Sequence, residues 1–235
     1  MKPHYRFSYL VLILFLAVSS AVPLSAAVSS AAETDSVTFI IDAGHGGEDG
    51  GAVAADGTRE SDLNLSIALR MDALMGLCGR PAVLTRDSGT IDYPDTAGTI
   101  RERKRYDQER RAALVNTTPQ SIFVSIHQNE YGGIGPRGGQ VLYNQFSGSG
   151  DFAVFVQEKI SALCGDHRKA AQISDEIFLM REANCPAILV ECGFLSNPEE
   201  LALLKTDDYQ KKLTVALAVG CLGYERELEN IYGKG

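Results

Sequence analysis

Four side chains of this chain stand at positions where they could take part in metal chemistry. His45 lies in the glycine-rich turn of IIDAGHGGEDGGA, His127 closes the apolar stretch SIFVSIH, and Glu191 closes PAILVE. Glu60 ends the polar loop before the first long helical pattern. Two imidazoles and one carboxylate are the protein ligands of many catalytic zinc sites, and a further acid beside the open position can transfer protons. These residue types favour a metal-dependent hydrolase.

The glycine-rich turn also allows a second interpretation, as a phosphate-binding loop. Its glycines, at positions 44, 46, 47, 50 and 51, do not follow the GxGxxG spacing, and no GK[ST] follows them. Asp42, Glu48 and Asp49 would repel an anion. The turn therefore suits a cation better, and glycines around His45 would let the backbone pass close to a metal without a Cβ in the way.

Each of these residues also has an ordinary structural explanation. A histidine in a glycine turn often makes only local hydrogen bonds, and a Glu at a helix start supports the helix dipole. Glu191 is harder to explain in this way, because a carboxylate inside an apolar strand is costly to bury unless it is paired. Asp42 is interpreted either as a residue that orients an imidazole or as a turn cap. Glu48 stays an alternative to Glu60, since it also lies near His45.

Apolar runs alternate with helical patterns along the chain. The patterns predict strands at 37–44, 81–86, 121–127, 138–144 and 186–194, and helices at 62–78, 100–116, 150–164, from Asn197 onward and at 207–228. This alternation predicts an α/β fold with helices on both faces of a largely parallel sheet. In such sheets, sites gather just beyond the strand ends, where His45, His127 and Glu191 stand.

The first 32 residues resemble a secretory signal peptide. Lys2 and Arg6 precede the apolar run YLVLILFLAV, and small residues suited to cleavage follow. We expect cleavage after Ala27 or Ala32; the alternative is an uncleaved segment that anchors the protein in the membrane. Residues 33–235 would then form one catalytic domain, exported to the cell envelope or the extracellular space.

The composition limits the choice of partners and redox chemistry. A content of 45% hydrophobic and 22% charged residues is typical of a globular domain, and a net charge of −8 argues against nucleic-acid binding. The five cysteines include no CxxC pair. We expect most of them to be small core residues, with one disulfide, such as Cys78–Cys221, as an open possibility.

Two arginine features receive structural interpretations. Basic residues between Arg101 and Arg111 are interleaved with acids, which predicts a solvated helix face with internal salt bridges. Arg86, in LTRD, is expected to pair with other groups for structural reasons.

Together the motifs IIDAGHGGEDGGA…ESDLNL, LTRD, SIHQN and PAILVECGFLSNPEE resemble the zinc-dependent N-acetylmuramoyl-L-alanine amidases of the bacterial cell wall. The resemblance covers nearly the whole mature chain, in the family's order. It implies that His45, Glu60 and His127 bind one Zn²⁺ per chain and that Glu191 is the catalytic acid/base. Asn129, two residues after His127 in an extended segment, is a candidate for substrate contact.

The resemblance also implies a central, mostly parallel sheet of about six strands flanked by helices. The implied reaction is hydrolysis of the amide between the lactyl group of N-acetylmuramic acid and L-Ala of the peptidoglycan stem peptide. No wall-binding repeat or zinc-occluding helical insertion is evident, and the chain has no Trp. We therefore expect a short, single-domain, monomeric form, which a partner protein or its compartment, such as the spore cortex, would target or activate.

Two other functions stay open at this stage. A zinc carboxypeptidase-like enzyme would share the fold and metal, but it is expected to need an Arg for the substrate's terminal carboxylate, and none lies in the metal motifs. A non-catalytic wall-binding domain would have no need for an intact set of ligands together with Glu191.

Overall fold

The computed structural model describes residues 37–132, 136–165, 168–173 and 176–232. The predicted signal peptide at residues 1–32 lies outside the described residues and stays a prediction. In the part of the chain that is described, no helix combines the length and the apolar character needed to cross a membrane.

A six-stranded sheet forms the centre of the catalytic unit, with strand order β2-β1-β3-β6-β4-β5. The strands are β1 (Thr38–Ala43), β2 (Val83–Leu84), β3 (Ser121–Asn129), β4 (Gln140–Tyr143), β5 (Ala171–Gln172) and β6 (Ala187–Phe194). β2, β1, β3 and β6 are parallel, whereas β4 runs antiparallel to β6 and parallel to β5. The prediction of a mostly parallel sheet of about six strands is confirmed. β5 was not predicted, because its two residues stand in the stretch RKAAQI, which lacks an apolar run like the one that contains β2.

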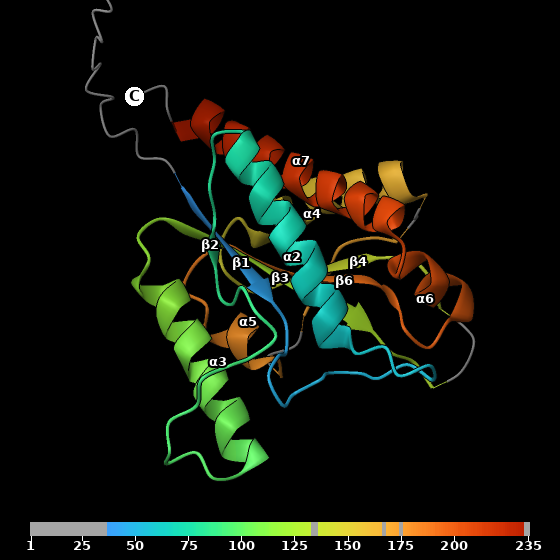
Figure 1. Cartoon of the computed structure of the whole chain (residues 1–235). Coiled ribbons are helices and arrows are strands. Elements are labelled where there is room, and N and C mark those ends of the chain that lie inside the picture. Colours follow the sequence, from blue (N-terminus) through green and yellow to red (C-terminus); the bar gives the residue numbers. More distant parts are fainter. Residues whose placement is uncertain (1–36, 133–135, 166–167, 174–175, 233–235) are drawn as a thin grey trace, which may run out of the picture. The chain divides into compact units, whose positions relative to one another are not determined.

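Helices cover both faces of the sheet, as predicted (Figure 1). On one face lie α2 (Glu60–Leu77), α4 (Ser149–Cys164) and α7 (Asp207–Tyr232), with α7 packed against both other helices. On the other face lie α3 (Ile100–Thr117) and the short α5 (Phe178–Glu182), which contact each other. A further helix, α6 (Pro198–Leu204), follows β6.

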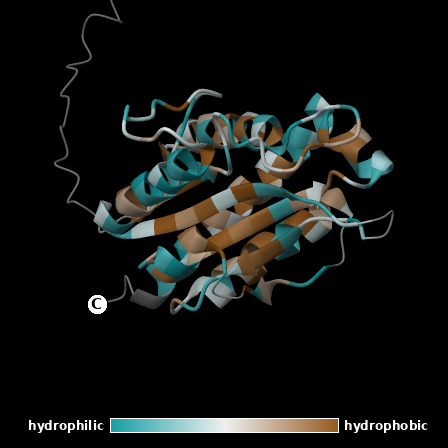
Figure 2. Ribbon diagram, turned by 90° about the horizontal axis from the view of Figure 1, so that it is seen from below, coloured by the Kyte–Doolittle hydropathy of each residue, from teal (hydrophilic) through white to brown (hydrophobic). Residues whose placement is uncertain are grey.

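Two hydrophobic cores lie on opposite sides of the sheet. Successive strand residues point to opposite faces, so Ile41 of β1 joins the larger core beside α2, α4 and α7, while Ile40 joins the smaller core beside α3 and α5. On β3, Val124 and Phe123 divide in the same way. Figure 2 shows strands that are hydrophobic along most of their length between helices with hydrophilic outer surfaces. The strands that lead to the site are therefore covered by a hydrophobic core on each face of the sheet.

The helix start at Asn197 follows its sequence signals. The Asn197 side chain accepts hydrogen bonds from the backbone N–H groups of Glu199 (3.0 Å) and Glu200 (3.3 Å), with Pro198 in the first turn. These bonds satisfy N–H groups that have no partner within the helix.

The possible Cys78–Cys221 disulfide is absent. Cys78 is exposed at the end of α2, whereas Cys221 is fully buried in α7, and both are free thiols. Cys185 and Cys192 are also buried, which confirms their prediction as core residues.

Candidate metal centre

The carboxyl ends of β1, β3 and β6 bring three of the predicted site residues to one edge of the sheet. His127 and Glu191 are register partners on the neighbouring parallel strands β3 and β6. His45 follows β1, which ends at Ala43. The fourth residue, Glu60, begins α2 on the opposite face of the sheet from α3. Parallel strands and the start of a helix thus converge on a single point.

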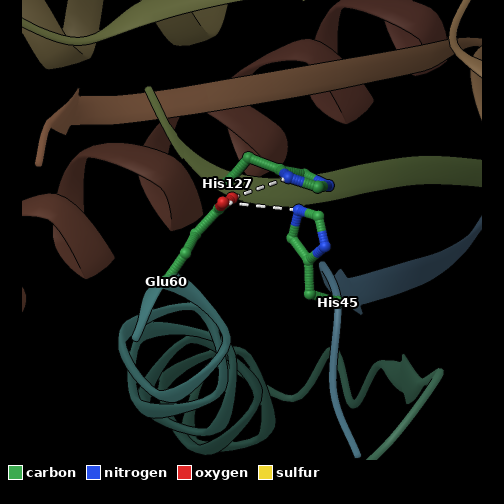
Figure 3. A group of neighbouring side chains, drawn as sticks. All are labelled: His45, Glu60 and His127. Atoms are coloured by element: carbon green, nitrogen blue, oxygen red, sulfur yellow. Dashed lines mark hydrogen bonds and ion pairs between the residues drawn. The ribbon is translucent and has the colours of Figure 1, made fainter. Parts of the chain in front are cut away.

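His45, Glu60 and His127 form a compact cluster at this point (Figure 3). Each can offer one ligand atom, and these atoms lie within 4.8 Å of one another. Glu60 Oε1 lies 2.9 Å from His127 Nδ1, and Glu60 Oε2 lies 3.3 Å from His45 Nε2. The donor set of two imidazoles and one carboxylate matches the chemistry of zinc.

The Glu60 carboxylate is held by backbone and side-chain donors as well as by the imidazoles. Gln128 N–H (3.0 Å) and the Asn64 side-chain amide (3.3 Å) donate to Oε1, and Ala52 N–H (2.9 Å) donates to Oε2. Burial favours the neutral acid, but the hydrogen bonds from His127 and His45 outweigh it and lower the pKa of Glu60 well below its usual range. Glu60 is therefore an ionised carboxylate with a fixed orientation, as a candidate metal ligand requires.

His45 has an unusual backbone conformation, and a carboxylate contacts the ring nitrogen that faces away from Glu60. Its φ is +60°, in the left-handed region, which costs a non-glycine residue about 1–2 kcal/mol. Its Nδ1 lies 3.0 Å from Asp49 Oδ2, and Lys104 Nζ lies 3.0 Å from the same oxygen. Burial acts to lower the pKa of His45, but the hydrogen bonds to Asp49 and Glu60 outweigh it and raise the pKa to about 9. Without a metal, the surroundings of His45 thus favour the protonated ring, and a metal ion would bind Nε2 in exchange for that proton.

Two glycines make room for the cluster. A Cβ at Gly44 would lie 2.3 Å from His127 Nε2, and a Cβ at Gly51 would lie 2.5 Å from Glu60 Oε2 and 2.7 Å from the His45 ring. Neither position can carry a side chain without moving a candidate ligand. The expectation that glycines let the backbone pass close to the site is therefore confirmed at these two positions.

Glu191 lies beside the cluster without joining it. Its Oε2 is buried and has no hydrogen-bond partner among the described residues. Burial raises the pKa of this carboxyl above its usual value. A carboxyl group that is not engaged elsewhere and has a raised pKa is suited to accept and return a proton.

A cleft of about 440 Å³ opens over the cluster. His45, His127 and Glu191 line it together with residues of α3 and α5, such as Gln108 and Phe178. Among the described residues, Asn129 is not part of the lining of this cleft. The register of the β3–β6 pair shifts beyond His127 and Glu191, and Asn129 lies opposite Phe194. The contribution of α5 was not predicted, because a five-residue helix leaves no periodic signal.

Glu48, the alternative to Glu60, lies outside the cluster. Its side chain is exposed and is paired with Arg103 of α3. The acid of the glycine-rich turn that contacts the cluster is Asp49, whose Oδ2 lies 3.0 Å from His45 Nδ1.

Arg111 corrects the interpretation of α3 as a purely solvated face. Arg101 and Arg105 are exposed, but Arg111 is only 2% exposed and its Nη1 donates to Asp42 Oδ1 at 2.8 Å. Asp42 is fully buried and also accepts bonds from the hydroxyl of Ser125. Asp42 therefore neither caps a turn nor hydrogen-bonds an imidazole.

Arg86 has the structural role that was predicted, although its partners are carbonyl groups. It is 6% exposed and donates hydrogen bonds to the backbone oxygens of Ala43 (2.8 Å), Gly44 (3.0 Å) and Ser61 (2.8 Å). It ties the turn before His45 to the start of α2.

The fold and cluster together define a class of protein. A His–Glu–His cluster and an unpaired carboxyl group, at the carboxyl edge of a mostly parallel sheet, form the arrangement of a hydrolytic metal site. The family model for N-acetylmuramoyl-L-alanine amidases matches residues 39–222, and the chain belongs to this family. It is accordingly an amidase that acts on the bacterial cell wall, and zinc dependence is typical of its relatives.

Individual relatives agree with this assignment. The germination-specific N-acetylmuramoyl-L-alanine amidase of Bacillus subtilis (strain 168) is 31% identical over 188 residues, which are 80% of this chain and 79% of the relative. The CwlD amidase from Clostridioides difficile, solved in complex with the GerS lipoprotein, is similar with a TM-score of 0.77 and 32% identity, covering 81% of this chain and 99% of that one. An N-acetylmuramoyl-L-alanine amidase from Clostridium difficile 630 has a TM-score of 0.71 and 28% identity, covering 86% and 100%.

Proposed function

We propose that this amidase is zinc-dependent and hydrolyses the amide between the lactyl group of N-acetylmuramic acid and L-Ala of the stem peptide. His45, Glu60 and His127 hold the ion, one per chain, and Glu191 is the catalytic acid/base. The observation that carries the proposal is the set of three ligand atoms within 4.8 Å of one another, beside a buried carboxylate oxygen that has no partner among the described residues.

The residues fit this ion in three respects. The donor set has the composition of a catalytic zinc site that leaves a position open for water. The absence of a Cβ at Gly44 and Gly51 leaves space for the ligands. Gln128, Asn64 and Ala52 donate hydrogen bonds to the Glu60 carboxylate. Hydrogen bonds from neighbouring residues to a ligand fix its orientation before the metal binds.

When bound, zinc lowers the pKa of a coordinated water and polarises the scissile carbonyl. Glu191 takes a proton from the attacking water and delivers it to the nitrogen of the leaving L-Ala. Its raised pKa suits both directions of transfer. Asp49 accepts a hydrogen bond from His45 Nδ1 and so leaves Nε2 directed at the centre of the cluster.

The biological setting follows from the relatives and from the sequence. We infer that residues 1–32 direct export and that residues 33–235 act on peptidoglycan in the cell envelope, with the spore cortex as one setting. The similar CwlD amidase was solved with the GerS lipoprotein, which supports a protein partner for this chain too. Asn129 stays a proposed substrate contact.

Digestion of purified peptidoglycan tests the reaction. The zinc-loaded protein is expected to release free L-Ala amino groups without new glycan reducing ends, as measured by mass spectrometry, and a chelator should abolish this release. Cleavage within the stem peptide would instead favour the carboxypeptidase-like reaction. Unchanged release after complete metal removal would refute zinc dependence, and binding without any product would indicate a wall-binding domain.

A further inference from the structure

Two buried guanidinium groups hold three consecutive carbonyl groups at the turn that carries His45. Arg111 Nη1 donates to the oxygen of Ala43 at 2.9 Å, and Arg111 Nη2 donates to the oxygen of His45 at 2.6 Å. Arg86 donates to the oxygens of Ala43 at 2.8 Å and Gly44 at 3.0 Å. Both arginines are less than one-tenth exposed. The backbone from 43 to 45 is therefore held from two sides.

These hydrogen bonds hold His45, whose backbone conformation is unfavourable for a residue with a side chain. His45 is in the left-handed region, with φ +60°, a conformation that a histidine keeps only where its surroundings enforce it. Relaxation of φ toward the extended region would rotate the adjoining peptide groups and move the His45 carbonyl away from Arg111. The same rotation would swing the imidazole away from Glu60, whose Oε2 lies 3.3 Å from His45 Nε2.

Arg111 is itself fixed by carboxylates on two sides. Its Nη1 lies 2.8 Å from Asp42 Oδ1, and its Nη2 lies 2.6 Å from Asp107 Oδ2. Asp42 is immobilised by the hydroxyls of Thr85 and Ser125, each at 2.6 Å. Each terminal nitrogen of Arg111 thus serves one carboxylate and one carbonyl. A lysine has a single nitrogen and cannot serve acceptors in this planar arrangement.

We propose that Arg111 is a positioning residue for the metal centre. Together with Arg86, it holds the His45 backbone in the conformation that directs the imidazole at Glu60 and His127. Arg111 acts through the His45 backbone and not on the substrate. This inference rests on the proposed function in one respect, that the ion bound by the cluster is zinc. If Arg111 merely stabilised the fold, its replacement would lower stability without changing the His45 turn in the folded protein.

The test compares Arg111→Lys with Arg105→Lys, a control on the same helix whose side chain is 72% exposed and pairs with Glu109. Hydrogen exchange is measured on the metal-free proteins below their unfolding transitions, and zinc affinity is measured by competition with a chromogenic chelator. Arg111→Lys should exchange faster over residues 43–47 with α7 unchanged. Its zinc Kd should rise about 10–100-fold, as for loss of other groups that orient metal ligands. The control should match the wild type in both measurements.

The outcomes separate this proposal from the proposed function. Unchanged exchange over 43–47, or a faster exchange with an unchanged zinc Kd, would overturn the positioning role of Arg111. A wild-type protein that binds no zinc would overturn the proposed cofactor, and the exchange comparison would still decide whether Arg111 holds the turn. If Arg111→Lys does not fold, Arg86→Lys replaces it, because Arg86 holds two of the three carbonyls of this turn, those of Ala43 and Gly44.

Discussion

His127 and Glu191 are register partners on β3 and β6, two neighbouring parallel strands. Such strands lie about 4.8 Å apart, and their hydrogen bonds fix that spacing. The candidate metal ligand and the candidate proton carrier are therefore held together by the sheet itself and not by a loop. Glu60 and His45, by contrast, depend on the start of α2 and on a strained turn for their positions.

The separate location of Glu191 predicts that proton transfer can be removed without loss of the metal. Glu191→Gln should bind zinc as the wild type does, because its carboxylate is not part of the His–Glu–His cluster. Its kcat should fall about 10²–10⁴-fold, the usual contribution of a general acid/base. Kinetic assay together with elemental analysis checks both parts. Near-wild-type kcat would exclude Glu191 as the acid/base.

Glu60 and Glu48 offer a matched pair of carboxylates. Glu60→Gln should reduce zinc occupancy, because a neutral amide is a poor ligand and the bonds to both imidazoles are weakened. Glu48→Gln should retain the metal, since Glu48 is exposed and paired with Arg103. Zinc content after dialysis against a weak chelator distinguishes the two. Equal occupancy in both variants would mean that Glu60 is not a ligand.

The sequence was informative where chemistry follows a strong secondary-structure signal. His127 and Glu191 close long apolar strands, and their meeting at one edge follows from the parallel arrangement of those strands. Glu60 could be placed with them only by the resemblance to the family. No local pattern in the sequence indicates that the start of this helix reaches the same edge of the sheet.

Arg111 shows why the rest could not be predicted. In the sequence it is one basic residue among several, and Asp107 four residues earlier looks like the partner in an ordinary surface salt bridge. Arg111 is also paired with the buried Asp42, which lies 69 residues earlier in the chain, and no sequence pattern indicates this contact. The buried side of α3 continues through Ala112 and Val115, and that apolar stripe was the available signal.

Close packing at Gly44 predicts a strong effect of one methyl group. In Gly44→Ala the new Cβ would lie 2.3 Å from His127 Nε2, so the imidazole must move. Zinc affinity should fall at least about tenfold, and the metal-free protein should lose about 1–3 kcal/mol of stability, as overpacked sites do. Zinc titration and urea unfolding measure these changes. Wild-type zinc affinity would show that His127 is not confined in this way.

Gly76→Ala is the control for this methyl group. Gly76 lies within α2, and a Cβ there meets nothing within 4 Å. The substitution should leave zinc binding unchanged and stabilise the helix by about 0.5–1 kcal/mol.

The buried pair of Asp42 and Arg111 predicts a pH-dependent loss of stability. Burial acts to raise the pKa of Asp42, but the charge of Arg111 and the hydroxyls of Ser125 and Thr85 outweigh it and hold the pKa below its ordinary value. Asp42→Asn should therefore cost about 3–5 kcal/mol at pH 7, the usual effect of breaking a buried ion pair. Urea unfolding of the chelated protein measures this difference.

The sign of the pH effect follows from proton uptake. Because the folded pKa of Asp42 is depressed, the unfolded chain binds the proton first on acidification, and the wild type loses this contribution as the pH falls below about 4. The gap in stability between wild type and Asp42→Asn should hence be constant from pH 7 to about pH 5 and narrow in more acidic solution. Asp56→Asn, at an exposed carboxylate paired with Lys205, should change stability little at any pH. A gap that stays constant into strong acid would mean that Arg111 does not depress the pKa of Asp42.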